Sequence, residues 1–243
     1  MTTDKLPDRT SARRDVDAFL ETVAATPAVR ARGSRGRLIF ALDATASRGP
    51  TWDQACHIQA EMFQEAEALG GLDIQLVFYR GFGECKASRF MSDASSLRAS
   101  MTSVTCLGGR TQIGKVLGHV ARTARRDKVD ALVFVGDAFE EELDPVCAVA
   151  GELGMLGVPA FMFHEGHDST SRKAFEEIAR LAGGACCGFD TGSAQQLREL
   201  LRAVAVYAVG GRSALESYGR RRGGEAARLA AGLKALPGAR TSR

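Results

Sequence analysis

Short apolar runs alternate with longer amphipathic segments along most of the chain. Residues 38–42 form a continuous apolar run, which is too short for a helix and typical of a strand buried on both faces. Residues 131–135 have the same character. Further strands are predicted at residues 74–79, 158–163 and 185–189, with a weaker strand at 87–91.

Helices are predicted between these strands from their capping residues and apolar spacing. Thr51 and Gln54 form a capping box at the start of one helix, which Gly70 and Gly71 end. Thr111 is expected to cap a helix over 112–126. Further helices are predicted at residues 15–25, 95–101, 145–156, 171–181 and 193–209.

The alternation of strands and helices predicts an α/β fold of the Rossmann-like type, with a mostly parallel sheet covered by helices on both faces. Residues 36–209 are predicted to form this domain. A short helix and a basic linker precede it in residues 1–35, and a basic tail follows in 210–243, partly helical or disordered. The tail carries eight basic and two acidic residues.

Composition adds little to this picture. The chain has 243 residues, of which 45% are hydrophobic and 25% charged, as in an ordinary soluble protein. A net charge of +3 gives no reason to expect a nucleic-acid partner. No apolar run reaches the roughly 20 residues that span a bilayer, and the six cysteines have no C-x-x-C spacing. We therefore expect a cytoplasmic protein with reduced thiols and no membrane association.

Oxygen-bearing side chains gather where the predicted strands end. Asp43 follows the first strand, with Thr45 and Ser47 at alternate positions after it. Asp137 follows a later buried strand, and Thr111 opens a helix. These positions share the edge of the sheet where ligands collect. The alternation predicts that the side chains of Asp43, Thr45 and Ser47 point the same way along an extended loop. An all-oxygen set suits a hard cation such as Mg²⁺.

The ordered set resembles the von Willebrand factor type A domain and its metal-ion-dependent adhesion site. The resemblance covers residues 36–209 and implies a Rossmann-like sheet with one antiparallel edge strand, for which 87–91 is the candidate. It implies that Thr45 and Ser47 bind the ion directly and that Thr111 binds it directly or through water. Asp43 and Asp137 would act through water or through hydrogen bonds to the hydroxyl ligands.

The same resemblance implies a function without catalysis. The domain would bind a protein partner by docking a partner Asp or Glu on a bound Mg²⁺ or Mn²⁺. Thr45 and Ala138 depart from the more usual serine and glycine, and Arg110 stands before Thr111 where glycine is common. A guanidinium there would either weaken ion binding or attract an acidic partner.

Two alternatives remain open for the function. One is a metal-dependent phosphohydrolase, because such enzymes also begin with an aspartate after the first strand. The haloacid-dehalogenase type needs a second acid two residues later, where this chain has Thr45. The other alternative is a scaffold with the same fold and no metal.

Two further polar segments have ordinary structural interpretations. The segment 164–168, His-Glu-Gly-His-Asp, is expected to be a polar loop after a strand, although its side chains could also bind a transition metal or do acid–base work. The acidic run 140–142 and Asp144 are expected in the first turn before a helix at Pro145, where the helix dipole favours negative charge.

Overall fold

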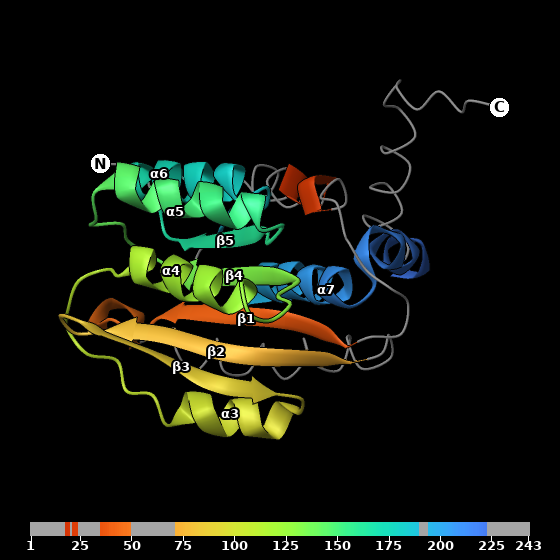
Figure 1. The fold of residues 1–243 in the computed structure, drawn as a ribbon, viewed down its shortest axis with the longest axis horizontal. Coiled ribbons are helices and arrows are strands. Elements are labelled where there is room, and N and C mark those ends of the chain that lie inside the picture. Colours follow the sequence, from red (N-terminus) through yellow and green to blue (C-terminus); the bar gives the residue numbers. More distant parts are fainter. Residues whose placement is uncertain (1–17, 20, 24–34, 50–70, 190–193, 223–243) are drawn as a thin grey trace, which may run out of the picture.

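The computed structural model describes residues 18–19, 21–23, 35–49, 71–189 and 194–222 (Figure 1). Its centre is a six-stranded sheet with the strand order β3-β2-β1-β4-β5-β6. The strands are β1 (Gly36–Asp43), β2 (Leu72–Arg80), β3 (Glu84–Met91), β4 (Ala131–Gly136), β5 (Ala160–Glu165) and β6 (Ala185–Phe189). The helical elements are η1 (Ala46–Arg48), α3 (Ala94–Thr102), α4 (Ile113–Ala124), α5 (Leu143–Met155), α6 (Ser169–Leu181) and α7 (Ala194–Arg222).

All neighbouring strands run parallel except β2 and β3. The predicted mostly parallel sheet with one antiparallel edge strand is therefore confirmed, and β3 is that edge strand. The central strands β1 and β4 are buried along almost their whole length, as their continuous apolar runs predict. Parallel pairing brings the carboxyl ends of five strands to one edge of the sheet.

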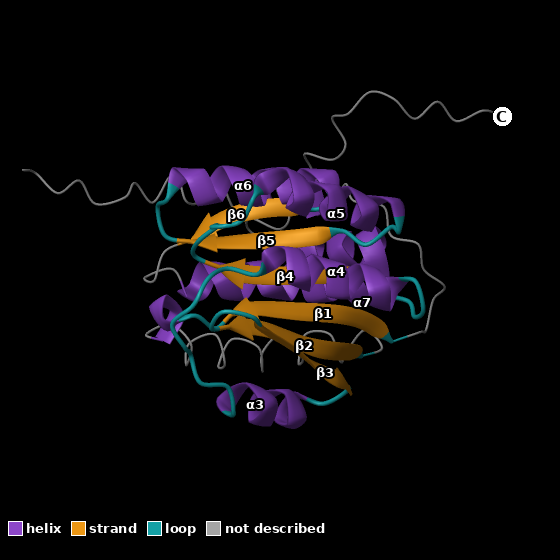
Figure 2. Ribbon diagram, turned by 60° about the vertical axis from the view of Figure 1, so that its left-hand side comes forward, coloured by secondary structure: helices purple, strands orange, loops and turns teal. Residues whose placement is uncertain are grey.

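Two hydrophobic layers enclose the sheet (Figure 2). Successive residues of β1 point to opposite faces, so that Phe40 joins one layer while Ile39 and Ala41 join the other. Helices α4, α5 and α6 supply the layer around Ile39, and α3 and α7 pack in the layer around Phe40. This packing fixes both the strands and the starts of the helices that surround the carboxyl edge.

The described part of the N-terminal segment packs on the domain rather than standing apart from it. Residues 18–19 and 21–23 are helical, and Phe19 and Val23 are buried. The Phe19 ring lies 5.2 Å from that of Phe163, centroid to centroid. The helix predicted over 51–69 lies outside the described residues.

The last helix is longer than predicted. Helix α7 continues past residue 209 to Arg222, with one non-helical residue at Gly211, where φ is +64°. Glycine adopts that left-handed conformation without steric cost, so the chain bends there and resumes its helix. Ala214, beyond the bend, still packs against the core. Among the described helices, none combines the length and apolarity needed to cross a membrane.

Candidate functional site

The loop after β1 is held by Asp43, which is fully buried. Its Oδ1 accepts a hydrogen bond from the Thr45 amide at 2.7 Å, and its Oδ2 accepts one from the Tyr79 hydroxyl at 2.8 Å. Burial raises the pKa of the Asp43 carboxyl, and these hydrogen bonds oppose that shift. Both carboxylate oxygens are thus engaged in fixing the loop.

Thr45 and Ser47 come together through a turn and not through an extended loop. The prediction of an extended loop is wrong beyond Thr45, because residues 46–48 form the 3₁₀ turn η1. The turn nevertheless places Thr45 Oγ1 and Ser47 Oγ 3.1 Å apart. Thr45 is buried and Ser47 is exposed, so the hydroxyl pair runs from the interior to the surface.

A second loop, residues 107–111, packs directly against the first. The Leu107 amide donates to the Ala44 carbonyl at 3.0 Å, and the Arg110 amide donates to the Gly81 carbonyl at 3.2 Å. The Arg110 side chain is exposed. This segment therefore brings an exposed arginine to the loops at this edge of the sheet.

The third loop begins at Asp137. The β1–β4 register ends at Leu42 and Val135, so Gly136 lies beside Asp43, where an added Cβ would be 3.5 Å from that of Asp43. The Asp137 Oδ1 atom is buried and has no hydrogen-bond partner among the described residues. An unpaired buried carboxylate oxygen is costly, and it points to a missing cation or donor.

Thr111 is bound to this third loop by two reciprocal hydrogen bonds. Its amide donates to Glu140 Oε2 at 3.1 Å, and its hydroxyl oxygen accepts from the Glu140 amide at 2.9 Å. The three loops that carry Asp43, Thr111 and Asp137 therefore meet at one edge of the sheet.

Two predictions about helix starts are wrong here. Gln112, not Thr111, occupies the N-cap position of α4, and its side chain makes no capping bond. The Glu141 carboxylate instead accepts from the first amides of α4, including Gly114 N at 3.0 Å. Of the acidic residues placed in the first turn of α5, only Asp144 lies there. Glu140 bonds Thr111 and Glu141 bonds the first amides of α4, whereas Glu142 is the N-cap residue of α5.

A buried ion pair that no sequence pattern predicts lies at the same edge. Arg48 is 2% exposed and pairs with Glu165 at the end of β5. Burial lowers the pKa of Arg48, while the charges of Asp137 and Asp43 oppose that shift. The charges of Glu165, Asp137 and Asp43 all act on this one guanidinium. An arginine after a Ser-containing loop gives no sequence signal of burial.

The segment 164–168 is more ordered than a polar loop. His164 and Glu165 end β5 and are buried, so the prediction of a loop is wrong for these two residues. The Asp168 side chain caps α6 by accepting from the amides of Thr170 and Ser171. Within the described ranges no group of three His, Cys, Asp or Glu residues is arranged to hold a metal ion.

The packing of the second loop gives a stability prediction. A Cβ on Gly109 would lie 2.0 Å from the Gly81 carbonyl oxygen, whereas one on Gly108 would meet nothing within 4 Å. We expect Gly109→Ala to lower the free energy of unfolding by about 1–3 kcal/mol, because backbone must move. Gly108→Ala is the matched control and should change little. Urea unfolding of the two variants measures this, and equal midpoints would contradict the close packing of the loops.

Comparison with solved structures identifies the fold. The structure matches a von Willebrand factor type A protein from Catenulispora acidiphila with a TM-score of 0.57 and 15% identity, covering 71% of this chain and 43% of that one. This chain has the von Willebrand factor type A fold. The SpRpn10 VWA domain also matches, with a TM-score of 0.57 and 11% identity over 69% of this chain and 94% of that domain.

A third solved structure that matches has zinc in its metal-ion-dependent adhesion site (MIDAS). Proximal thread matrix protein 1 from the mussel byssus, in a structure with a zinc-occupied MIDAS motif, matches with a TM-score of 0.54 and 14% identity. The match covers 71% of this chain and 46% of the byssus protein. This chain therefore spans less than half of the Catenulispora and byssus chains. No protein-family model matches the sequence, and comparison with curated proteins gives no significant relative.

Proposed function

We propose that this VWA domain is a protein-binding module that holds Mg²⁺ or Mn²⁺ at Thr45, Ser47 and Thr111, supported by Asp43 and Asp137. The observation that carries the proposal is the hydroxyl pair of Thr45 and Ser47, 3.1 Å apart, at the edge where Asp137 has a buried oxygen without a partner. The VWA fold is common among domains that mediate protein–protein interaction, which is in keeping with this role.

The residues present fit a hard divalent cation. The donors are hydroxyl and carboxylate oxygens, which Mg²⁺ prefers. Thr111 uses one lone pair of its hydroxyl oxygen for Glu140 and keeps the other. Arg48 itself opposes ion binding through its own charge, so we expect weak affinity.

A bound divalent ion would supply positive charge and exchangeable water positions. Ser47 and Arg110 are exposed, so a partner carboxylate can approach the rim from solvent. The partly dry interface strengthens the attraction between such a carboxylate and the cations. Arg110 would then bind the same acidic side chain or its neighbour.

Two alternatives are weaker on the same geometry. A phosphohydrolase would need an accessible carboxylate nucleophile, but Asp43 is fully buried and both its oxygens accept hydrogen bonds. A scaffold without metal gains some support from Arg48, which already neutralises part of the site. Arg48 is too buried to contact a partner, however, so it cannot replace the docking role of the ion.

Partner binding should depend on the ion and on the rim. In Mg²⁺, a partner captured from native lysate should bind the wild-type domain and be lost in EDTA. Thr111→Ala should weaken binding at least tenfold because it removes a ligand oxygen, and Arg110→Glu should weaken it by charge repulsion. Surface plasmon resonance with the purified partner measures all three effects.

Arg98→Glu is the matched control for the charge reversal. Arg98 is exposed on α3, and α3 does not form the carboxyl edge. Equal affinity in Mg²⁺ and EDTA would leave the fold intact and remove the metal-dependent mechanism. An equal loss in the Arg110 and Arg98 variants would show only general electrostatic attraction.

A further inference from the structure

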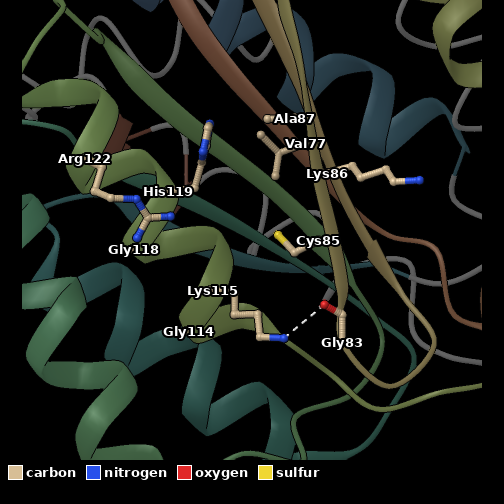
Figure 3. Close-up of a pocket in the computed structure, with 10 residues that line it drawn as sticks. All are labelled: Val77, Gly83, Cys85, Lys86, Ala87, Gly114, Lys115, Gly118, His119 and Arg122. Atoms are coloured by element: carbon tan, nitrogen blue, oxygen red, sulfur yellow. Dashed lines mark hydrogen bonds between the residues drawn. The ribbon is translucent and has the colours of Figure 1, made fainter.

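A cleft of about 440 Å³ lies between α4 and the hairpin of β2 and β3 (Figure 3). Its size is within the range of ligand sites in proteins. None of the residues proposed to hold the ion lines it. Its lining includes Val77, Cys85 and Ala87 from the strands and Lys115, His119 and Arg122 from α4.

Two cations dominate the electrostatics of this cleft. Lys115 and Arg122 are exposed and seven residues apart, so they share one face of α4 about 10 Å from each other along the helix axis. The Lys115 ammonium donates to two uncharged acceptors, Gly83 O at 3.1 Å and Gln112 Oε1 at 2.9 Å. These bonds orient the ammonium without neutralising its charge.

In the part of the chain that the structure describes, no carboxylate pairs with these cations. The lining contains no Asp or Glu, and among the described residues neither cation forms an ion pair. The nearby Glu84 is already paired with Arg80 at 3.0 Å and with Lys86 at 2.7 Å. Figure 3 shows that the Lys86 side chain points away from α4. Lys86 therefore pairs with Glu84 on the side of the strand that faces away from α4.

The charges of Lys115 and Arg122 both reach the Cys85 thiol inside the cleft. Burial raises the pKa of the Cys85 thiol, and the charges of Lys115 and Arg122 both oppose that shift. Burial lowers the pKa of His119, and the charge of Arg122 lowers it further. The His119 ring therefore contributes shape to the cleft more than charge. Its Nε2 lies 2.9 Å from Gln75 Oε1, which fixes the ring as a wall.

Hydrogen bonds through Gly81 join the hairpin beside the cleft to the rim of the proposed docking site. The turn between β2 and β3 is bound to the second loop through Gly81, whose carbonyl accepts from the Arg110 amide and from Gln112 Nε2 at 3.2 Å each. Strand β3 is the edge strand, and within the described sheet its outer side pairs with no strand. A chain segment in the cleft would run beside β3 and emerge near Arg110.

We infer that this cleft binds an acidic segment of a partner protein, with carboxylates on Lys115 and Arg122. The cleft runs beside the edge strand β3, where the exposed Ala87 and the half-buried Cys85 suit the uncharged side chains of such a segment. Nucleic acid needs a longer row of phosphate-binding cations than two. This binding goes beyond the proposed metal-dependent docking and does not require the ion.

A decapeptide of alternating glutamate and serine, titrated into the full-length protein in EDTA, tests the inference. Amide NMR shifts of Cys85, Gly118 and His119 report binding in the cleft itself, apart from any binding to the basic C-terminal segment. The double variant Lys115→Gln/Arg122→Gln should weaken the peptide affinity measured from those shifts at least tenfold. Glutamine removes charge while keeping most of the side-chain volume.

The matched control is Lys173→Gln/Arg180→Gln, which changes the same residue types at the same spacing on α6. Both residues are exposed and neither lines the cleft. Unchanged cleft shifts and affinity in this control support the inference, provided both doubles melt as the wild type does. Equal weakening in the two doubles would overturn it, as would absent cleft shifts. Tighter cleft binding by a ten-nucleotide single strand, or equal binding by inorganic phosphate, would also overturn it.

Discussion

Arg48→Met is expected to lower the free energy of unfolding by about 3–5 kcal/mol. The substitution leaves the Glu165 carboxylate at the end of β5, where its side chain is 7% exposed, without its guanidinium partner. Asp43 and Asp137 lose the same compensating charge. Breaking a buried ion pair from one side is costly because an uncompensated charge remains in the interior. Urea unfolding followed by circular dichroism measures the change.

A second variant separates charge from packing. Arg48→Met/Glu165→Leu removes both charges, and we expect it to recover much of the loss, since a buried pair and an apolar replacement often have similar stability. The exposed pair Arg180–Glu177 is the control, and Arg180→Met should leave the unfolding midpoint almost unchanged. A midpoint for Arg48→Met equal to that control would contradict the burial of the pair.

The second large effect concerns the ion. Thr45→Ala/Ser47→Ala should weaken Mg²⁺ binding at least tenfold, because it removes the two hydroxyl oxygens expected to contact the ion directly. The free energy of unfolding should fall by only about 1 kcal/mol, since these side chains lie at a loop rim. Asp43 keeps its hydrogen bond from Tyr79 in the variant, so the strand end stays in place. Calorimetric titration with Mg²⁺ measures the binding.

The control for that variant removes the same two hydroxyl types elsewhere. Ser169→Ala/Thr170→Ala changes exposed residues at the start of α6, where Asp168 caps the helix through backbone amides. Its Mg²⁺ affinity should equal that of the wild type. Unchanged affinity in the Thr45/Ser47 double variant would mean that Mg²⁺ binds somewhere else on the chain.

The sheet could be predicted from sequence because its strands are buried on both faces. The run at 38–42 must be apolar at every position, and such a run is too short to be confused with a helix. Even the weak edge strand was recovered, although its exposed residues blur the pattern. The placement of Asp43 and Asp137 at one edge follows from parallel pairing alone, since neighbouring parallel strands end together.

Contacts between loops could not be predicted in the same way. Glu141 caps α4, and Arg48 pairs with Glu165. In both contacts the two partners are 27 or more residues apart in the sequence. Local patterns favoured the nearer explanations, namely capping by Thr111 and an acidic first turn in α5. The 3₁₀ turn η1 was missed because alternation of polar residues suits both an extended strand end and a tight turn.

The extent of the last helix was underestimated for a related reason. Gly210 and Gly211 normally mark the end of a helix, and a basic composition begins there. In the structure Gly211 only bends α7, because packing of Ala214 on the core favours a continued helix. The division of the chain at residues 35 and 209 remains a prediction.

Paramagnetic broadening by Mn²⁺ tests most directly whether three loops together hold an ion. Added in small amounts to the isotope-labelled full-length protein, Mn²⁺ should first broaden the amide signals of residues 44–48, 107–111 and 137–140, and excess Mg²⁺ should restore them. Those loops meet through the bonds from Leu107 to Ala44 and from Glu140 to Thr111. Broadening centred on His167, on the last helix or on one loop alone would contradict the metal site.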